Sequence, residues 1–232
     1  MVREMLRAIK RAVGGGIAFV FPSAWKHRSE LRFWKNLVRG EYKGRLINDW
    51  YEPLYTEVYG LSREDYKGKR VLDIGCGPLG SLEWADMTAR RVGLDPLVPR
   101  YLKLGAARHK MEYVASRSEN IPFPNGYFDF VTSLNSLDHV DNLDRTITEI
   151  KRVVKEGGRF LLSVEINHPP TSTEPITIDD LALRKFGPEF EVLSEFRVGT
   201  PQDHNGHRAV RMRCPAYVAG QPGFYVARYL RR

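Results

Sequence analysis

The sequence predicts a doubly wound α/β fold, in which helices cover both faces of a mostly parallel sheet. Two observations predict it: short apolar runs alternate with helical segments from residue 70 onward, and the first run ends in a glycine-rich turn. The expected strands are Arg70–Ile74, Arg91–Leu94, Glu112–Val114, Phe128–Ser133 and Arg159–Val164. The expected helices are Leu79–Thr88, Val98–Arg108 and Leu143–Val154. This alternation makes successive strands parallel, because each helix returns the chain to the starting edge of the sheet.

Two further apolar runs near the C-terminus, Phe190–Val198 and Phe224–Leu230, predict an antiparallel strand pair. The segment 199–223 between them is polar and contains three prolines. It is too long for a tight hairpin, so we expect an irregular insertion over a functional face of the sheet.

The first part of the chain, residues 1–60, predicts a helical N-terminal cap or lid, and residues 61–232 form the expected sheet domain. Ser29–Val38 has the spacing of an amphipathic helix. Leu46–Tyr59 is expected as a further helix, with Pro53 bending it or starting its second half. Its many tyrosines are explained equally well by core packing and by a lid over a ligand.

The start of the chain is basic, and residues 2–13 predict a basic amphipathic helix. Residues 1–45 hold 11 basic and three acidic side chains, a net charge of +8, whereas residues 46–232 hold 25 of each sign. The helix therefore packs on its own domain or on a second copy in a homodimer, or it contacts the inner membrane face peripherally. No run is apolar enough to span a membrane, and no cleavage site precedes Trp25, so we expect a cytoplasmic location.

The composition is that of a globular protein, with 42% hydrophobic and 28% charged residues in 232. Two cysteines exclude a disulfide scaffold and a cysteine-only zinc site, and they favour a reducing compartment. Residues 46–232 have no net charge, so nucleic acid is not an expected partner.

The glycine-rich turn lies in the sequence VLDIGCGPLG, residues 71–80. Gly75 and Gly77 allow a tight turn and a close approach by a ligand. Asp95 ends the second expected strand, 18 residues after Gly77, and can accept hydrogen bonds from both ribose hydroxyls. Asp73 places a carboxylate before the glycines, which repels phosphate and suits a cationic, amino-acid-like ligand.

These motifs resemble those of the class I S-adenosylmethionine (SAM)-dependent methyltransferases, whose first motif is V-L-D-x-G-x-G-x-x-G. The resemblance continues through IPFPNGYFDFV at 121–131, SLDHV at 136–140 and IKRVVKEGGRF at 150–160. It covers about residues 68–165 and is similar to the small-molecule branch of the family. It implies a Rossmann-like fold, SAM as cofactor and residues 61–232 as the methyltransferase domain.

The resemblance also implies roles for single residues at the cofactor site. Those carried over are Asp73, Gly75 and Gly77 at the methionine portion, Asp95 at the ribose, Pro96 at the adenosine and Asn135 at the methionine end. The family's usual adenine-binding aspartate falls on Arg117, which cannot accept a hydrogen bond from the adenine amino group. Ser118 or Glu119 replaces it, or Arg117 stacks on the ring.

Methyl transfer to a hydroxyl benefits from a general base, and His139 after the fourth strand is the first candidate. Asp138 acts instead or orients the imidazole, and the alternative is a structural role for His139. The residues expected to face a substrate are Tyr51, Tyr55, His168, His204 and His207. Asp203 with the neighbouring histidines of the insertion resembles a loose metal site, but ligand geometry cannot be inferred from a loop. We therefore predict no metal.

The predicted function is SAM-dependent methyl transfer to a small molecule, at a hydroxyl of a sugar or another hydroxylated metabolite. An RNA substrate is disfavoured, because SLNS at 133–136 lacks an Asn/Asp-Pro-Pro-Tyr-type motif. The alternatives are C- or N-methylation of another metabolite, and a catalytically inactive SAM-binding partner subunit.

Overall fold

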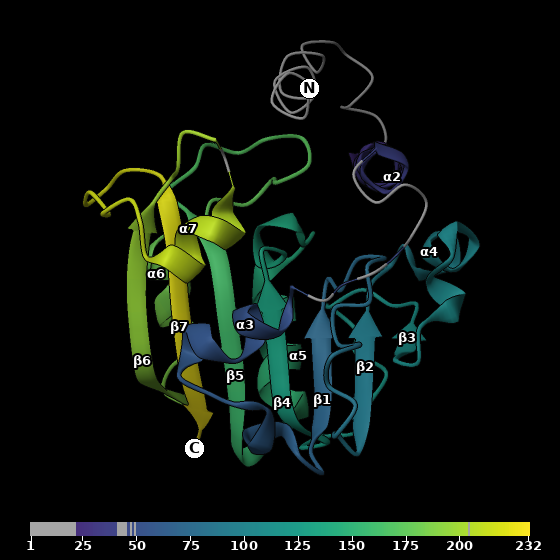
Figure 1. The fold of residues 1–232 in the computed structure, drawn as a ribbon. Coiled ribbons are helices and arrows are strands. Elements are labelled where there is room, and N and C mark those ends of the chain that lie inside the picture. The colour runs from purple at the N-terminus through teal and green to yellow at the C-terminus, as the bar shows by residue number, and fades with distance from the viewer. Residues whose placement is uncertain (1–21, 41–45, 47, 49, 204) are drawn as a thin grey trace.

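The computed structural model describes residues 22–40, 46, 48, 50–203 and 205–232 (Figure 1). The strands are β1 (Arg70–Ile74), β2 (Arg90–Leu94), β3 (Glu112–Val114), β4 (Phe128–Leu134), β5 (Val154–Ile166), β6 (Phe190–Gly199) and β7 (Gly223–Arg231). The α-helices are α2 (Pro22–Gly40), α3 (Glu52–Tyr55), α4 (Val98–Leu104), α5 (Leu143–Val153), α6 (Asp180–Arg184) and α7 (Gly206–Met212). The short 3-10 helices are η2 (Glu57–Tyr59), η3 (Arg63–Tyr66), η4 (Ala106–Arg108) and η5 (Leu137–His139).

The seven strands form one sheet in the order β3-β2-β1-β4-β5-β7-β6. The first five strands are parallel, and β7 runs antiparallel to both β5 and β6. The predicted Rossmann-like sheet with an antiparallel C-terminal pair is therefore confirmed. The carboxyl ends of the parallel strands meet at one edge, and α2 lies beyond that edge (Figure 1).

Alternate residues of β1 and β5 enter two hydrophobic cores, one on each face of the sheet. Leu72 and Leu162 belong to the core that includes α5 and α6. Their neighbours Val71 and Leu161 belong to the core that includes α3 and α7. The helices α3 and α5 lie on opposite faces (Figure 1). This alternation places the side chain of Asp73 on the face covered by α3.

The helix predicted for Leu79–Thr88 is wrong, because the structure has successive turns there. Gly80 has a φ of 72°, which a right-handed helix does not allow. The backbone bonds are short-range ones, from Glu83 N–H to the Gly80 carbonyl and from Ala85 N–H to that of Leu82. The left-handed glycine thus interrupts a segment whose apolar spacing alone favours a helix.

Two other predictions are correct only for part of their segments. Within Leu46–Tyr59 only α3 and η2 are helical among the described positions, since Pro53 allows a helix to begin but not to run through it. The segment 199–223 is not wholly irregular, because it contains α7. The Asn205 side chain accepts a hydrogen bond from Arg208 N–H and caps that helix.

The predicted helix at residues 2–13 lies outside the described residues. Within the described ranges, every helix is too short or too polar to cross a bilayer.

Candidate functional site

The turn after β1 brings the backbone against two neighbouring segments. Gly75 and Gly77 have φ values of 73° and 58°, which favour glycine. A Cβ at Gly75 would lie 2.3 Å from the Cβ of Ser136, and one at Gly77 would lie 2.8 Å from the indole of Trp34. The two glycines are therefore required by the close approach of η5 on one side and α2 on the other.

Asp73 lies at the end of β1 and is almost fully buried, with 2% of its surface exposed. Thr132 Oγ1 donates to its Oδ1 at 2.6 Å, and the Tyr55 hydroxyl donates to its Oδ2 at 3.0 Å. Thr132 is its register partner on β4, which explains the first contact. Burial raises the pKa of Asp73 to about 6, against the opposing effect of these hydrogen bonds.

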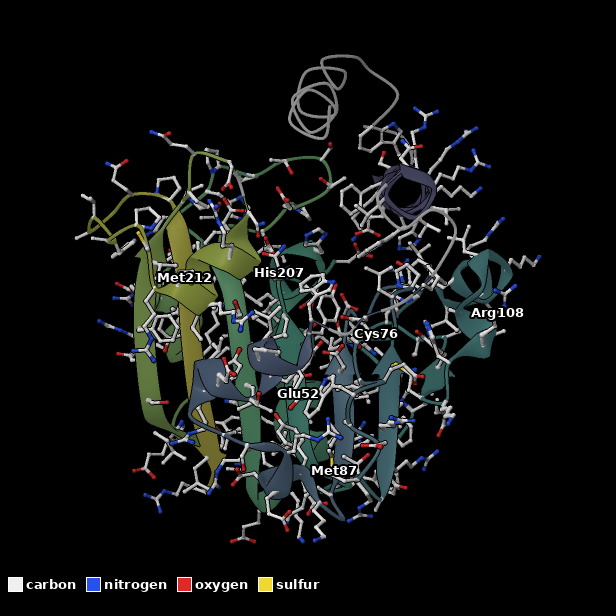
Figure 2. The ribbon with its side chains drawn as sticks, viewed as in Figure 1. Glu52, Cys76, Met87, Arg108, His207 and Met212 are labelled. Atoms are coloured by element: carbon white, nitrogen blue, oxygen red, sulfur yellow. The ribbon has the colours of Figure 1, made fainter. Side chains whose placement is uncertain are left out.

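Asp95 lies directly after β2 and is also buried. Its Oδ1 accepts a hydrogen bond from Leu97 N–H at 2.8 Å, and Tyr101 donates to Oδ2 at 3.5 Å. Burial raises the pKa of Asp95 to about 7. The two carboxylates flank the turn. Burial raises the pKa of the Cys76 thiol, which lies beyond β1 (Figure 2), and the charges of Asp95 and Asp73 raise it further. This end of the sheet therefore favours a ligand with a cationic group.

The other predicted cofactor contacts lie along the same edge. Pro96 and Asn135 are exposed, and Asn135 adopts a left-handed backbone with a φ of 53° directly after β4. Both are accessible next to strand ends, as a ligand contact requires.

The predicted adenine-binding residues already have partners within the protein. Ser118 is buried and exchanges a 2.9 Å hydrogen bond with Thr146. Glu119 Oε1 accepts hydrogen bonds from the N–H groups of residues 141 and 142, at 2.8 and 2.9 Å. Arg117 forms an ion pair with Asp141. Adenine recognition by any of the three stays a prediction.

The predicted catalytic pair lies in η5, next to residues from three other segments. Asp138 is 1% exposed, and its Oδ2 is 3.3 Å from Nε2 of His168. His139 Nδ1 lies 3.1 Å from Glu30 Oε1 on α2. His139 Nε2 faces Asp138 Oδ1 at 3.9 Å and Glu174 Oε1 at 4.0 Å.

The negative charges around the two imidazoles govern their protonation. Burial alone would lower the pKa of His139, but the hydrogen bond to Glu30 and the charge of Asp138 raise it to about 9. The contact with Asp138 raises the pKa of His168 to about 9 as well. An imidazole that holds its proton at neutral pH cannot accept another, so the predicted base role of His139 requires the pair with Glu30 to open.

The residues predicted to face a substrate divide between two places. Tyr51 lies close to His207 on α7, with ring centroids 5.8 Å apart. Tyr55 instead contacts Asp73, and His168 contacts Asp138. His204 lies outside the described residues.

The described members of the Asp203 group, which resembles a loose metal site in sequence, have other surroundings in the structure. Asp203 forms a 2.6 Å ion pair with Arg208 and accepts a hydrogen bond from Asn205 N–H. Burial lowers the pKa of His207 to about 4, so its imidazole is neutral at physiological pH.

Several site residues were not predicted from the sequence. Thr132 could have been found from strand register, because a parallel neighbour of Asp73 must come from β4. Glu30 and Glu174 contact His139 across 109 and 35 positions of sequence, and no local pattern indicates such contacts.

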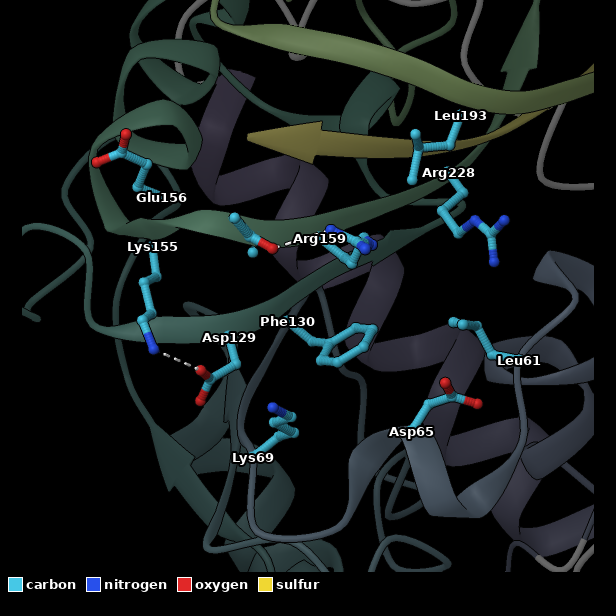
Figure 3. Close-up of a pocket in the computed structure, with 12 residues that line it drawn as sticks. Leu61, Asp65, Lys69, Asp129, Phe130, Lys155, Glu156, Arg159, Leu193 and Arg228 are labelled. Carbon is cyan, nitrogen blue, oxygen red and sulfur yellow. Dashed lines mark hydrogen bonds and ion pairs between the residues drawn. The ribbon is translucent and has the colours of Figure 1, made fainter. Parts of the chain in front are cut away.

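A cavity of about 380 Å³ lies at the amino ends of the parallel strands (Figure 3). Its lining includes Lys69, Lys155 and Asp129. Lys155 and Asp129 are paired at 3.4 Å. In open α/β sheets ligands bind at the carboxyl ends of the strands, so this cavity is not the candidate site.

Comparisons with known proteins agree with this geometry. The family described as "Methyltransferase domain" matches residues 72–162. A ubiquinone biosynthesis O-methyltransferase from Dechloromonas aromatica is 40% identical over 151 residues, which cover 56% of this chain and 62% of that protein. A sterol 4-C-methyltransferase from Caenorhabditis elegans is 33% identical over 135 residues, covering 55% and 40%. The chain thus spans less than two thirds of either relative.

Among solved structures, the N-methyltransferase NodS from Bradyrhizobium japonicum, in complex with S-adenosyl-L-homocysteine, has a TM-score of 0.61 and 14% identity. The alignment covers 89% of this chain and 98% of NodS, and it shows a shared fold. Residues 72–162 therefore carry a methyltransferase domain of the SAM-dependent class, and the glycine turn with its two carboxylates is the expected site for SAM as its cofactor.

Proposed function

We propose that this protein transfers the methyl group of SAM to a hydroxyl oxygen of a small molecule, a sugar or another hydroxylated metabolite. The bond between the methyl carbon and sulfur breaks, and its electron pair stays on sulfur. A bond forms between the methyl carbon and the acceptor oxygen, and the hydroxyl proton leaves to a base or to solvent. The protein contributes chiefly by orienting the two reactants for in-line displacement.

Asp73 and Asp95 support the cofactor half of this proposal. Both are buried carboxylates at the carboxyl ends of neighbouring strands, on either side of a turn that only glycine can form. Asp73 suits the ammonium group of SAM, and Asp95 suits its ribose hydroxyls.

The group of carboxylates and imidazoles after β4 carries the proposal of an oxygen acceptor. Ser136, which begins this segment, packs on Gly75 and donates to the Ile74 carbonyl at 2.8 Å. Asp138 and His139 follow after Leu137, so groups able to attract a proton or a polarised hydroxyl lie close to the glycine turn. Methyl transfer to an unactivated carbon has less use for such groups.

The names of the two relatives point to different acceptor atoms. The name of the ubiquinone biosynthesis enzyme specifies O-methylation, and that of the sterol enzyme specifies 4-C-methylation. Transfer to carbon is therefore the second candidate, and the product distinguishes the two.

The test is to incubate the full chain with methyl-labelled SAM and a panel of sugars, phenols and other hydroxylated metabolites. We expect label in an organic product, a methyl resonance typical of an ether, and stoichiometric S-adenosyl-L-homocysteine. The Asp95→Ala variant should bind SAM about ten- to a hundredfold more weakly, from the loss of charge-assisted hydrogen bonds. A C-methyl product would establish the second candidate. SAM binding without transfer to any acceptor would favour the inactive partner subunit.

A further inference from the structure

Asp138 is the most deeply buried charged side chain of the candidate site, with 1% of its surface exposed. Its Oδ2 contacts His168, whereas within the described part of the chain its Oδ1 has no hydrogen-bond partner. A buried carboxylate is costly unless donors or a cation compensate its charge. The groups closest to its two oxygens are Nε2 of His139 and Nε2 of His168, at 3.9 and 3.3 Å.

Asp138, His139 and Glu174 each point one potential metal-ligating atom toward a common space. These three atoms lie within 4.8 Å of one another, and His139 Nε2 is 3.9 and 4.0 Å from the two carboxylate oxygens. Atoms that bind one ion at about 2.1 Å lie about 3 to 4 Å apart. Two of the three separations are at the upper end of that range and the third is at most 4.8 Å, so an inward movement of less than about 1 Å would bring all three atoms into contact with one ion.

The surroundings hold His139 in the orientation that a metal ligand needs. Its Nδ1 lies 3.1 Å from Glu30, and Nε2 faces the carboxylates, where a binding ion would displace the Nε2 proton to solvent. Metal-binding histidines commonly donate their second ring N–H to a carboxylate in this way. The nearby Lys26 ammonium is directed elsewhere, to the His139 carbonyl at 2.7 Å and to Asp141. It does not fill the space between the three ligand atoms.

We propose that Asp138, His139 and Glu174 bind a divalent transition-metal ion, with His168 holding the second oxygen of Asp138. One imidazole nitrogen and two carboxylate oxygens favour Mn²⁺, Fe²⁺, Co²⁺ or Zn²⁺ over Mg²⁺ and Ca²⁺, which prefer oxygen alone. This site replaces the sequence-based expectation of no metal, and it lies apart from the insertion histidines. If the proposed function holds, an ion here would bind the acceptor hydroxyl and lower its pKa.

The test is binding of Co²⁺ to the chelator-treated full chain, followed by calorimetry and by the visible absorption of the bound ion. We expect one Co²⁺ per chain. Glu174→Gln and His139→Gln should each weaken binding about tenfold or more. Glu174 is 23% exposed on its side chain, so Glu174→Gln should fold normally. His109→Gln and Glu64→Gln, which lie outside the cluster, should bind Co²⁺ like the natural protein.

Absence of stoichiometric binding, or equal affinity in Glu174→Gln and Glu64→Gln, would overturn the proposal. The outcome is independent of catalysis, because it measures binding without SAM or an acceptor. Metal binding without methyl transfer would leave this site standing and reject the proposed function. Methyl transfer by a chain that binds no Co²⁺ would support the proposed function and reject the metal site.

Discussion

At the scale of single residues, the ionised carboxylate of Asp73 lowers the stability of the fold and is expected to favour binding of the cationic cofactor. Its folded-state pKa of about 6 exceeds the reference value of 3.8, so the folded state binds this proton more tightly than the unfolded state. The protonated carboxyl of Asp73 therefore stabilises the fold fully below pH 3.8, its pKa in the unfolded chain, and this stabilisation is lost as the pH rises through about 6. The ionised carboxylate thus lowers stability at neutral pH by about 3 kcal/mol at most.

The Asp73→Asn variant should therefore bind SAM about ten- to a hundredfold more weakly, because the cationic ligand loses its counter-charge. Its thermal midpoint at neutral pH should equal or exceed that of the natural protein. Calorimetry and thermal melts measure the two effects. Asp129→Asn is the matched control: the Arg70 N–H and Lys155 hold the pKa of Asp129 below its usual value despite burial. That variant should lose stability at neutral pH and keep its SAM affinity.

The same carboxylate predicts the pH dependence of cofactor binding. SAM affinity should fall as the pH is lowered from about 8 to about 5, because Asp73 and Asp95 take up protons near pH 6 and 7. Asp73→Asn should flatten the part of this profile near pH 6. A natural protein whose SAM affinity is constant over that range would contradict the assignment of both carboxylates.

Which site residues were predictable depends on whether their partners are local. Asp73, Gly75 and Asp95 belong to one strand-turn-strand unit, so their spacing alone indicates a shared site. Tyr55 was expected at the substrate, yet it donates to Asp73. Glu30 reaches His139 only after α2 has docked on the sheet. Long-range contacts of this kind carry no signal in a single sequence.

At the scale of elements, the strands were predictable because apolar runs of the right length have few other uses in an α/β chain. The segment Leu79–Thr88 was not, because its apolar spacing fits both a helix and a series of buried turns. The backbone of Gly80 decides between them, with a φ that the sequence alone does not specify. Pro53 similarly limits a longer predicted helix to α3 and η2 among the described positions.

The helix α2 covers the glycine turn through Trp34. The indole lies against Gly77, and its ring centroid is 6.4 Å from that of Tyr101, which itself contacts Asp95. We expect Trp34→Ala to raise the dissociation rate of SAM about tenfold, since loss of a packed aromatic acts mainly on dissociation. Stopped-flow measurement of cofactor release tests this.

Trp50→Ala provides the control for that experiment, because Trp50 contacts Tyr51 and His207 instead of the turn. Its SAM dissociation rate should be unchanged. Slower release or tighter binding in Trp34→Ala would show that the indole obstructs the site instead of covering the bound cofactor.

At the scale of the whole molecule, the sheet separates two edges with different chemistry. The carboxyl edge combines buried acidic groups with the cover provided by α2, whereas charged groups at the amino edge pair with one another. The mostly parallel character of the sheet was predictable, because parallel strands need crossover connections and the sequence alternates strands with helices. The position of α2 was not, because an amphipathic helix specifies which of its faces is buried but not where it packs.

The charge distribution along the chain supports a prediction about location. The net charge of +8 belongs to residues 1–45, and residues 2–13 contribute four basic side chains and one acidic one. Near an anionic surface each Lys or Arg contributes about 1 kcal/mol, an attraction that salt screens. We therefore expect the full chain to co-sediment with phosphatidylserine-containing vesicles at low salt, and deletion of residues 2–13 to abolish this. The deletion should leave SAM affinity unchanged, and phosphatidylcholine vesicles serve as the uncharged control. A full chain that stays in the supernatant at low salt would reject membrane contact and favour packing of this segment on its own domain or on a second copy.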